Sequence, residues 1–362
     1  MATIATITLL WKLDTATGGA LRLPLAALLL AFAVYRYTRP APDTSLKGRR
    51  LLITGAAHGI GAQLALTAAA RGARLVLWDC DGAALAAVAE RAREALRASG
   101  EAVSSRDRSA VLTAQVDVGD AAAMAAAQAE ALRVGAVDSV VSCAGLLHGA
   151  DVRALSAEQV ARALAVNVGA PFTLARLFLP HMEAGIRGGG AAGGVRGTLV
   201  LFSSVMGGLG AAQLADYCAS KHALQGLADC LRQELNRDGL RDALGVHLVC
   251  PWLVDTDMFK GAFMRRSWLA GAFLRAFPPR RAQDVAAATL DALALQHGVH
   301  RTYYLPLPMR FITLALRALS APSLRAFDWL TALAGGREGM VGWQGAEHNV
   351  AAVKAGPQRR RA

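Results

Sequence analysis

A tyrosine and a lysine one helical turn apart give the strongest chemical signal in the chain. Tyr217 and Lys221 are four positions apart, so on a helix they lie on the same face. A free phenol has a pKa of about 10 and is a weak base at neutral pH. A nearby ammonium favours the phenolate, which makes proton transfer by Tyr217 feasible.

A serine completes the possible catalytic group. Ser204 precedes Tyr217 by thirteen residues and follows the apolar run 197–202, which is typical of a buried parallel strand. Such a strand delivers the hydroxyl to the carboxyl edge of a sheet, where open α/β sheets bind ligands. The spacing of Tyr217 and Lys221 alone is more typical of an ordinary amphipathic helix. The serine after a strand reverses that preference, and the three residues together look like a Ser-Tyr-Lys site that dehydrogenates alcohols.

Composition indicates which kinds of partner the protein binds. The chain has 362 residues, enough for one large domain or two ordinary ones, and 54% of them are hydrophobic, so we expect membrane contact. A net charge of +12 suits nucleic acid or an anionic membrane surface. No Lys/Arg cluster is interleaved with aromatic residues, which argues against nucleic acid. The five cysteines are far apart and include no C-x-x-C pair, which indicates reduced thiols and no metal site.

The first 47 residues predict a membrane anchor and linker. Residues 23–35 are apolar throughout. As a helix they span about 20 Å, short of the roughly 30 Å hydrocarbon core, so the segment either spans with its flanks or lies in one leaflet. A cleaved signal peptide is the alternative, but the apolar run starts late. Positive charges are more numerous after the run than before it, which places the following domain on the cytosolic side.

A glycine-rich loop follows the first expected strand, residues 49–53. Gly55, Gly59 and Gly61 let the backbone turn tightly and approach a pyrophosphate at the start of a helix over 59–71. The second expected strand, 74–78, ends at Asp79, whose carboxylate suits ribose hydroxyls and repels a 2′-phosphate. Its alternative role, capping the next helix, is one that Asp81 fills. The sequence therefore favours NAD over NADP.

Further buried strands are expected at 111–116, 138–142, 197–202, 245–250 and 301–305, with helices at 158–180 and 215–237. Residues 308–334 predict one or two helices in which Arg310, Arg317 and Arg325 share a face. That face suits a membrane surface, and a core or dimer helix with a solvated stripe is the equal alternative.

These motifs resemble the short-chain dehydrogenase/reductase family over about residues 48–310. Residues 54–61 match its T-G-x-x-x-G-x-G pattern, and 217–221 match its Tyr-x-x-x-Lys pattern. Residues 76–79, 217–221 and 250–261 together resemble the membrane-bound branch that contains retinol and 17-beta-hydroxysteroid dehydrogenases. Two departures stand out. Ser142 and Cys143 replace the family's asparagine pair, which predicts looser hydrogen bonding at that strand end, and Trp252 replaces a glycine.

The resemblance implies a doubly wound (Rossmann) α/β domain over 48–307, with a mostly parallel seven-stranded sheet ordered 3-2-1-4-5-6-7. Amphipathic helices over 308–336 and a basic tail over 337–362 would follow. In this family's terms Tyr217 is the general base or acid, Lys221 lowers its pKa and binds the nicotinamide ribose, Ser204 holds the substrate oxygen, and Asn167 supports a proton relay. The implied NAD contacts are Gly55, His58, Gly59, Ile60, Gly61, Asp79, Asp117, Val118, Ala144, Gly145, Tyr217, Lys221, Pro251 and Thr256. No metal is implied.

Apolar side chains that follow the fourth and sixth strands are expected to line the substrate pocket: Leu146, Leu147, Trp252, Met258, Phe259, Phe263 and Met264. They favour a retinoid- or steroid-sized alcohol, or its carbonyl, over a short polar alcohol. A ketosteroid or long-chain carbonyl reductase is one alternative. A catalytically idle nucleotide-binding protein of a membrane or lipid-droplet surface is another. We expect a homodimer on the endoplasmic reticulum or a lipid droplet.

Overall fold

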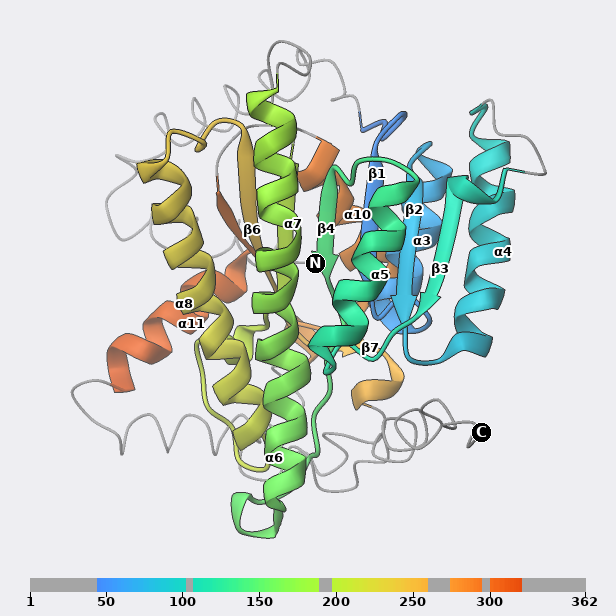
Figure 1. Ribbon diagram of the computed structural model, residues 1–362. Coiled ribbons are helices and arrows are strands. Elements are labelled where there is room, and N and C mark those ends of the chain that lie inside the picture. Colours follow the sequence, from blue (N-terminus) through green and yellow to red (C-terminus); the bar gives the residue numbers. More distant parts are fainter. Residues whose placement is uncertain (1–43, 102–106, 189–196, 260–273, 295–299, 321–362) are drawn as a thin grey trace, which may run out of the picture. The chain divides into compact units, whose positions relative to one another are not determined.

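The computed structural model describes residues 44–101, 107–188, 197–259, 274–294 and 300–320, with the side chains of 317–320 left aside (Figure 1). All of these belong to the unit that begins at Thr44. Most of the predicted anchor, the basic tail and most of the predicted C-terminal helices lie outside the described residues, so those boundaries stay predictions.

A seven-stranded parallel sheet forms the centre of this unit, in the order β3-β2-β1-β4-β5-β6-β9. The strands are β1 Arg50–Thr54, β2 Arg74–Asp79, β3 Val111–Gln115, β4 Ser139–Ser142, β5 Gly197–Phe202, β6 Leu244–Pro251 and β9 Arg301–Leu305. The predicted strand order is confirmed. Because the order reverses between β1 and β4, a crevice is expected at their carboxyl ends.

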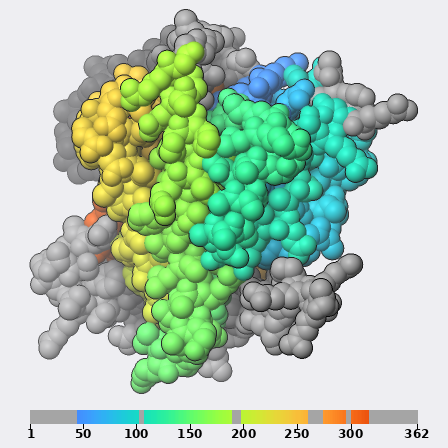
Figure 2. Space-filling view, viewed as in Figure 1, coloured from blue at the N-terminus to red at the C-terminus, as the bar shows by residue number. Residues whose placement is uncertain are grey.

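Helices cover both faces of the sheet. On one face lie α3 Gly59–Ala70, α4 Gly82–Ala98 and α10 Ala282–Ala294, and on the other α5 Ala121–Arg133, α6 Ala157–Leu164, α7 Ala170–Arg187 and α8 Ala215–Arg237. Figure 1 shows α5, α7 and α8 in front of the strands, and in Figure 2 they cover that face closely.

Side chains alternate between the two faces along each strand. In β1, Leu51 and Ile53 belong to the core cluster under α3, α4 and α10, whereas Leu52 belongs to the cluster under α5, α7 and α8. Every residue of β1 is buried, which explains the continuous apolar run that marks this strand in the sequence.

The long helix predicted over 158–180 is helical throughout but not uniform. A π-helical segment, Ala165–Gly169, joins α6 to α7. A short parallel pair, β7 Val254–Asp255 with β8 Arg280–Arg281, was not predicted. A last helix, α11, covers Pro308–Ser320.

The run Ala157–Arg187 is long and apolar enough to cross a membrane, and no other helix among the described residues is. Of its most apolar window, 44% is buried inside the fold. A core helix passes the same test, so this run alone is weak support for a membrane span.

Candidate active site

A cavity of about 810 Å³ lies at the carboxyl ends of β1, β2, β4, β5 and β6. The loops after these strands supply its lining. With the exception of Asn167, every residue predicted from the sequence to be catalytic or to bind the cofactor lines this cavity.

The glycine-rich turn after β1 requires its glycines. A Cβ at Gly61 would lie 1.9 Å from the carbonyl oxygen of Gly55. Gly55 has a φ of +67°, and a Cβ there would lie 2.8 Å from the Cα of Ala144. The turn is therefore fixed against the loop that follows β4.

The start of the loop after β4 is hydrogen-bonded to the neighbouring strand β1, although looser hydrogen bonding was expected there. The hydroxyl of Thr54 accepts hydrogen bonds from the backbone N–H groups of Cys143 (3.1 Å) and Ala144 (3.3 Å). Thr54 thus ties the end of β1 to the start of the loop after β4.

After β2, Asp81 caps the next helix, and Asp79, the last residue of β2, has a different role. Asp81 caps α4 by accepting from the N–H of Ala84, as expected from the sequence, and lies 3.0 Å from the Nε2 of His58. Asp79 is buried and accepts from the backbone N–H groups of Ala57 (2.9 Å) and Asp81 (3.0 Å). The carboxylate of Asp79 is therefore held at the cavity wall and takes no part in the cap.

Ser204, Tyr217 and Lys221 are brought together as the sequence predicted. All three are buried and line the cavity. The Nζ of Lys221 lies 5.4 Å from the centroid of the Tyr217 ring and donates to the carbonyl oxygen of Phe202 (2.7 Å). The residue after β5 holds α8 a second time, because the hydroxyl of Ser203 donates to the carbonyl oxygen of Lys221 (2.9 Å).

Burial dominates the protonation of this group. It raises the pKa of Tyr217 to about 12, and a hydrogen bond with Ser204 acts in the opposite direction. Burial also lowers the pKa of Lys221 to about 8. Burial is thus the largest influence on the pKa of the phenol in this arrangement, and the ammonium of Lys221 is bonded to Phe202.

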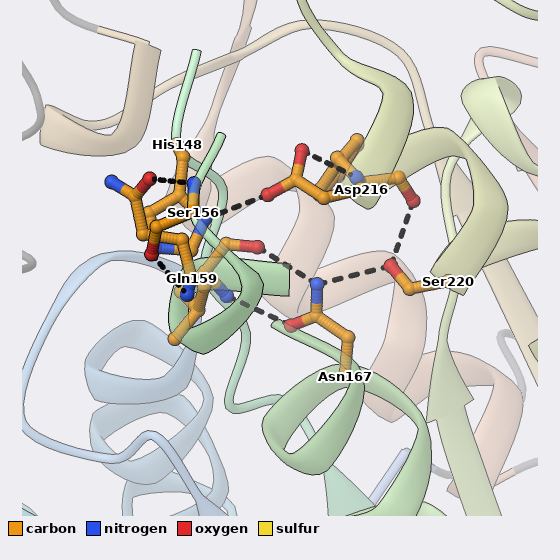
Figure 3. A network of polar contacts seen from close by, with 8 residues as sticks. His148, Ser156, Gln159, Asn167, Asp216 and Ser220 are labelled. Atoms are coloured by element: carbon orange, nitrogen blue, oxygen red, sulfur yellow. Dashed lines mark hydrogen bonds and ion pairs between the residues drawn. The ribbon is translucent and has the colours of Figure 1, made fainter. Parts of the chain in front are cut away.

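Asn167 lies behind the cavity wall, in the π-helical segment. Its Oδ1 accepts from the N–H of Leu146 (2.9 Å), and its Nδ2 donates to the carbonyl oxygen of Leu146 (2.8 Å) and to the hydroxyl of Ser220 (3.0 Å) (Figure 3). The side-chain amide is thus occupied by protein groups. These contacts attach the loop after β4 to α8.

An apolar cluster surrounds the phenol. Tyr217, Leu147, Leu214 and Cys218 form it, and Met206, Ala211, Met258 and Phe259 pack against it. The ring of Phe259 meets that of Tyr217 edge-on, with centroids 6.2 Å apart. Leu146, Trp252, Met258 and Phe259 line the cavity as expected, Leu147 does not, and Phe263 and Met264 lie outside the described residues.

Two pairs of charged or polar side chains in the site were not predicted, because nothing in the sequence indicates them. Arg162, on α6, lines the cavity and pairs with the predicted adenine contact Asp117 at 2.8 Å. His148 and Asp216 form a pair at 2.8 Å beside Tyr217. Both pairs join residues far apart in the chain. In the part of the chain that the structure describes, no three His, Cys, Asp or Glu side chains come together as a metal site would need.

The comparisons with known protein sequences agree on one family. Residues 49–266 match the profile of the family described as short chain dehydrogenase. Retinol dehydrogenase 10 of Xenopus tropicalis is 33% identical, covering 66% of this chain and 71% of its own, and the Homo sapiens protein of that name is 32% identical with the same coverage.

Solved structures share the fold. A short chain dehydrogenase/reductase from Burkholderia phymatum in complex with NAD is 28% identical and covers 77% of this chain and 95% of its own, with a TM-score of 0.59. A gluconate 5-dehydrogenase from Burkholderia cenocepacia in complex with NADP and tartrate is 26% identical and covers 73% and 96%, with a TM-score of 0.57.

Proposed function

The chain belongs to the short-chain dehydrogenase family, a family of oxidoreductases, and we propose that it interconverts a large apolar alcohol of retinol size and its carbonyl with NAD. One observation carries this proposal. Ser204, Tyr217 and Lys221 line the same cavity, and the phenol is enclosed by apolar side chains.

The size and lining of the cavity support both ligands. Its volume of about 810 Å³ lies in the upper part of the range for small-molecule sites. The glycine turn, Asp79 and Thr256 lie along the part suited to a dinucleotide, and the cluster with Phe259 and Leu214 adjoins the phenol. Burying apolar substrate surface there gains roughly 25 cal/mol per Å², which favours a retinoid over a short polar alcohol.

In the proposed reaction each residue acts at a stated atom. NAD, when bound, accepts the hydride from the alcohol carbon. The hydroxyl of Ser204 holds the substrate oxygen, and the phenol oxygen of Tyr217 takes the proton in oxidation or gives it in reduction. With a pKa of about 8, Lys221 is mostly an ammonium at neutral pH, and it stabilises the phenolate as that charge develops.

NAD is the proposed cofactor because of Asp79. Its two oxygens accept from Ala57 and Asp81, which hold a negative charge at the cavity wall. A carboxylate there accepts from the ribose hydroxyls and repels a 2′-phosphate. A relative of known structure holds NADP, so parallel kinetics with NAD and NADP decide this point. A wild-type preference for NADP contradicts the assignment.

We further propose that the substrate is taken from a membrane on which the protein lies. The support is the apolar run at residues 23–35 and the exposed apolar side chains Leu307, Phe311 and Leu314 at α11. The cytosolic orientation, the organelle and the homodimer are part of the same proposal.

The test is turnover by purified protein in detergent. All-trans-retinol, a 17-hydroxysteroid and a short-chain alcohol are compared by kcat/KM with NAD, in the wild type and in Tyr217→Phe. We expect the apolar alcohols to be preferred and Tyr217→Phe to lose nearly all turnover while NADH binding is retained. Equal efficiency on the short-chain alcohol, or more than a few per cent activity in Tyr217→Phe, contradicts the proposal.

A further inference from the structure

The helix that carries Tyr217 begins without a capping side chain at its usual position. The N-cap residue of α8 is Leu214, which makes no side-chain cap and is buried in the apolar cluster beside the phenol. The first N–H groups of a helix have no partner within the helix, and Tyr217 is the third residue of α8. An apolar residue at the cap leaves these groups to be satisfied in another way.

Asp216 satisfies one of them. Its Oδ1 accepts from the backbone N–H of Tyr217 at 2.8 Å, and its side chain is 0% exposed. The other oxygen, Oδ2, lies 2.8 Å from the Nδ1 of His148, in the loop after β4 (Figure 3). A carboxylate in the first turn of a helix also interacts favourably with the helix dipole.

The carbonyl group of Tyr217 is held in a similar way. It accepts from the hydroxyl of Ser220 (2.7 Å), and that hydroxyl accepts from the Nδ2 of Asn167 (3.0 Å). Asn167 is in turn bonded to both backbone groups of Leu146. The N–H of Tyr217 is therefore bonded to a carboxylate that also contacts His148, and its carbonyl to a hydroxyl that Asn167 links to Leu146. Figure 3 labels His148, Asn167, Asp216 and Ser220 in this network.

The loop so attached forms part of the cavity. Ala144, Gly145 and Leu146 line it, and Leu147 packs against Tyr217. The ties by Asp216 and Asn167 thus fix the distance between the phenol and the loop wall that faces it. A displacement of about 1 Å in such an arrangement costs up to about 100-fold in rate.

We propose that His148 and Asp216 are positioning residues for Tyr217: the pair fixes the backbone of the tyrosine against the loop after β4. This inference rests on the proposed function only for its effect on turnover. The bond to the Tyr217 N–H is a property of the fold, and it is measured without substrate.

The experiment compares five proteins with the wild type: Asp216→Ala, Asp216→Asn, His148→Ala, the double alanine variant and a control, Asp229→Ala. Asp229 is an exposed carboxylate on the same helix that pairs with Arg232 at 3.1 Å. Three quantities are measured: kcat and KM, NADH affinity, and hydrogen exchange at the amide of Tyr217.

We expect Asp216→Ala to lower kcat by about 10- to 100-fold with NADH affinity within twofold of wild type. Asp216→Asn should recover to within about threefold, because its amide oxygen accepts from Tyr217 and its NH₂ donates to the other tautomer of His148. His148→Ala should lower kcat by about fivefold alone and have no further effect beside Asp216→Ala, since contacting residues are non-additive. Exchange at Tyr217 should rise in both single alanine variants and stay unchanged in Asp229→Ala.

The proposal is overturned if kcat is unchanged in Asp216→Ala, if kcat and NADH affinity fall together, if Asp216→Asn gives no recovery, or if the effect of His148→Ala is the same in both backgrounds. Should Asp216→Ala fail to fold, His148→Ala carries the test, because the side chain of His148 is 14% exposed whereas that of Asp216 is 0% exposed. If the wild type turns over no alcohol, the proposed function fails. Unchanged exchange at Tyr217 in His148→Ala then overturns this inference separately.

Discussion

A glycine-to-alanine substitution is expected to have opposite effects on stability at two positions in helices. A Cβ at Gly61 would lie 1.9 Å from the carbonyl oxygen of Gly55, whereas a Cβ at Gly226, on α8, meets nothing within 4 Å. We expect Gly61→Ala to lower the free energy of unfolding by about 3 kcal/mol, as overpacking does. Gly226→Ala should raise it by about 0.5–1 kcal/mol, because alanine restricts the unfolded chain. Urea unfolding of both variants checks this, and equal stabilities would falsify it.

Lys221 is expected to lower the stability of the folded protein although turnover requires it. Burial lowers its pKa to about 8 from an ordinary value of 10.5. Between these two pH values the unfolded chain binds more protons, so stability rises with pH there, and the full cost of the buried charge is present below pH 8. Lys221→Met should therefore stabilise the cofactor-free protein by roughly 1–4 kcal/mol at pH 7 and abolish turnover.

Urea unfolding at pH 7 and pH 9.5 measures this effect, with Lys47→Met, an exposed lysine, as the control. The gain from Lys221→Met should shrink at the higher pH. A gain that stays constant shows that packing and not charge is its source.

At the scale of residues, the site residues that belong to a local pattern were predicted from the sequence. Ser204, Tyr217 and Lys221 follow from spacing along one strand and one helix. The pair of His148 with Asp216 joins positions 68 residues apart, and nothing in either local sequence marks it. The high pKa of Tyr217 was missed for a related reason, since desolvation depends on what surrounds the ring.

At the scale of elements, buried strands are the best predicted part. β5 and β9 have the predicted bounds. The other strands of the large sheet differ by one residue, at one end in β2, β3 and β4 and at both ends in β1 and β6, because apolar runs ended by glycine or polar residues are distinct. The π-helical segment was not predicted. Its sequence continues an apolar helix, and the deviation places Asn167 against Leu146, which is a tertiary contact. The pair β7–β8 also depends on a tertiary contact, between Val254 and Arg280.

One side of helix α11 is expected to bind a membrane surface. Leu307, Phe311 and Leu314 are 61%, 64% and 52% exposed and recur at four and three positions, so they share one side. Inserting a phenylalanine into lipid gains about 1.5–3 kcal/mol. We expect Phe311→Glu to weaken binding to anionic vesicles by about tenfold or more, measured by co-sedimentation. Val152→Glu, at an equally exposed site elsewhere, is the control, and equal weakening by both variants argues against a specific face.

At the scale of the whole molecule, the described fold predicts where the chain can be shortened. Leu46 is fully buried and the backbone N–H of Leu46 donates to the carbonyl oxygen of Arg71, so the catalytic unit needs the chain from about Thr44 onward. Deleting residues 1–43 should leave the melting temperature within about 2 °C and remove resistance to carbonate extraction from membranes. Full retention in the membrane pellet places the anchor elsewhere, first in 308–334.

The spread of the cavity along the chain has a consequence for synthesis. Its lining runs from Gly55 to Phe259, and about 200 residues separate Gly55 from Thr256. At 5–20 residues per second a ribosome needs about 10–40 s to cover that distance. The glycine turn emerges first and waits for β6, while the edge of β5 that pairs with β6 stands open to other chains. A chain that ends before Pro251 lacks Pro251, Trp252 and Thr256 of the lining, so we expect it to be bound by chaperones or degraded and to have no partial activity.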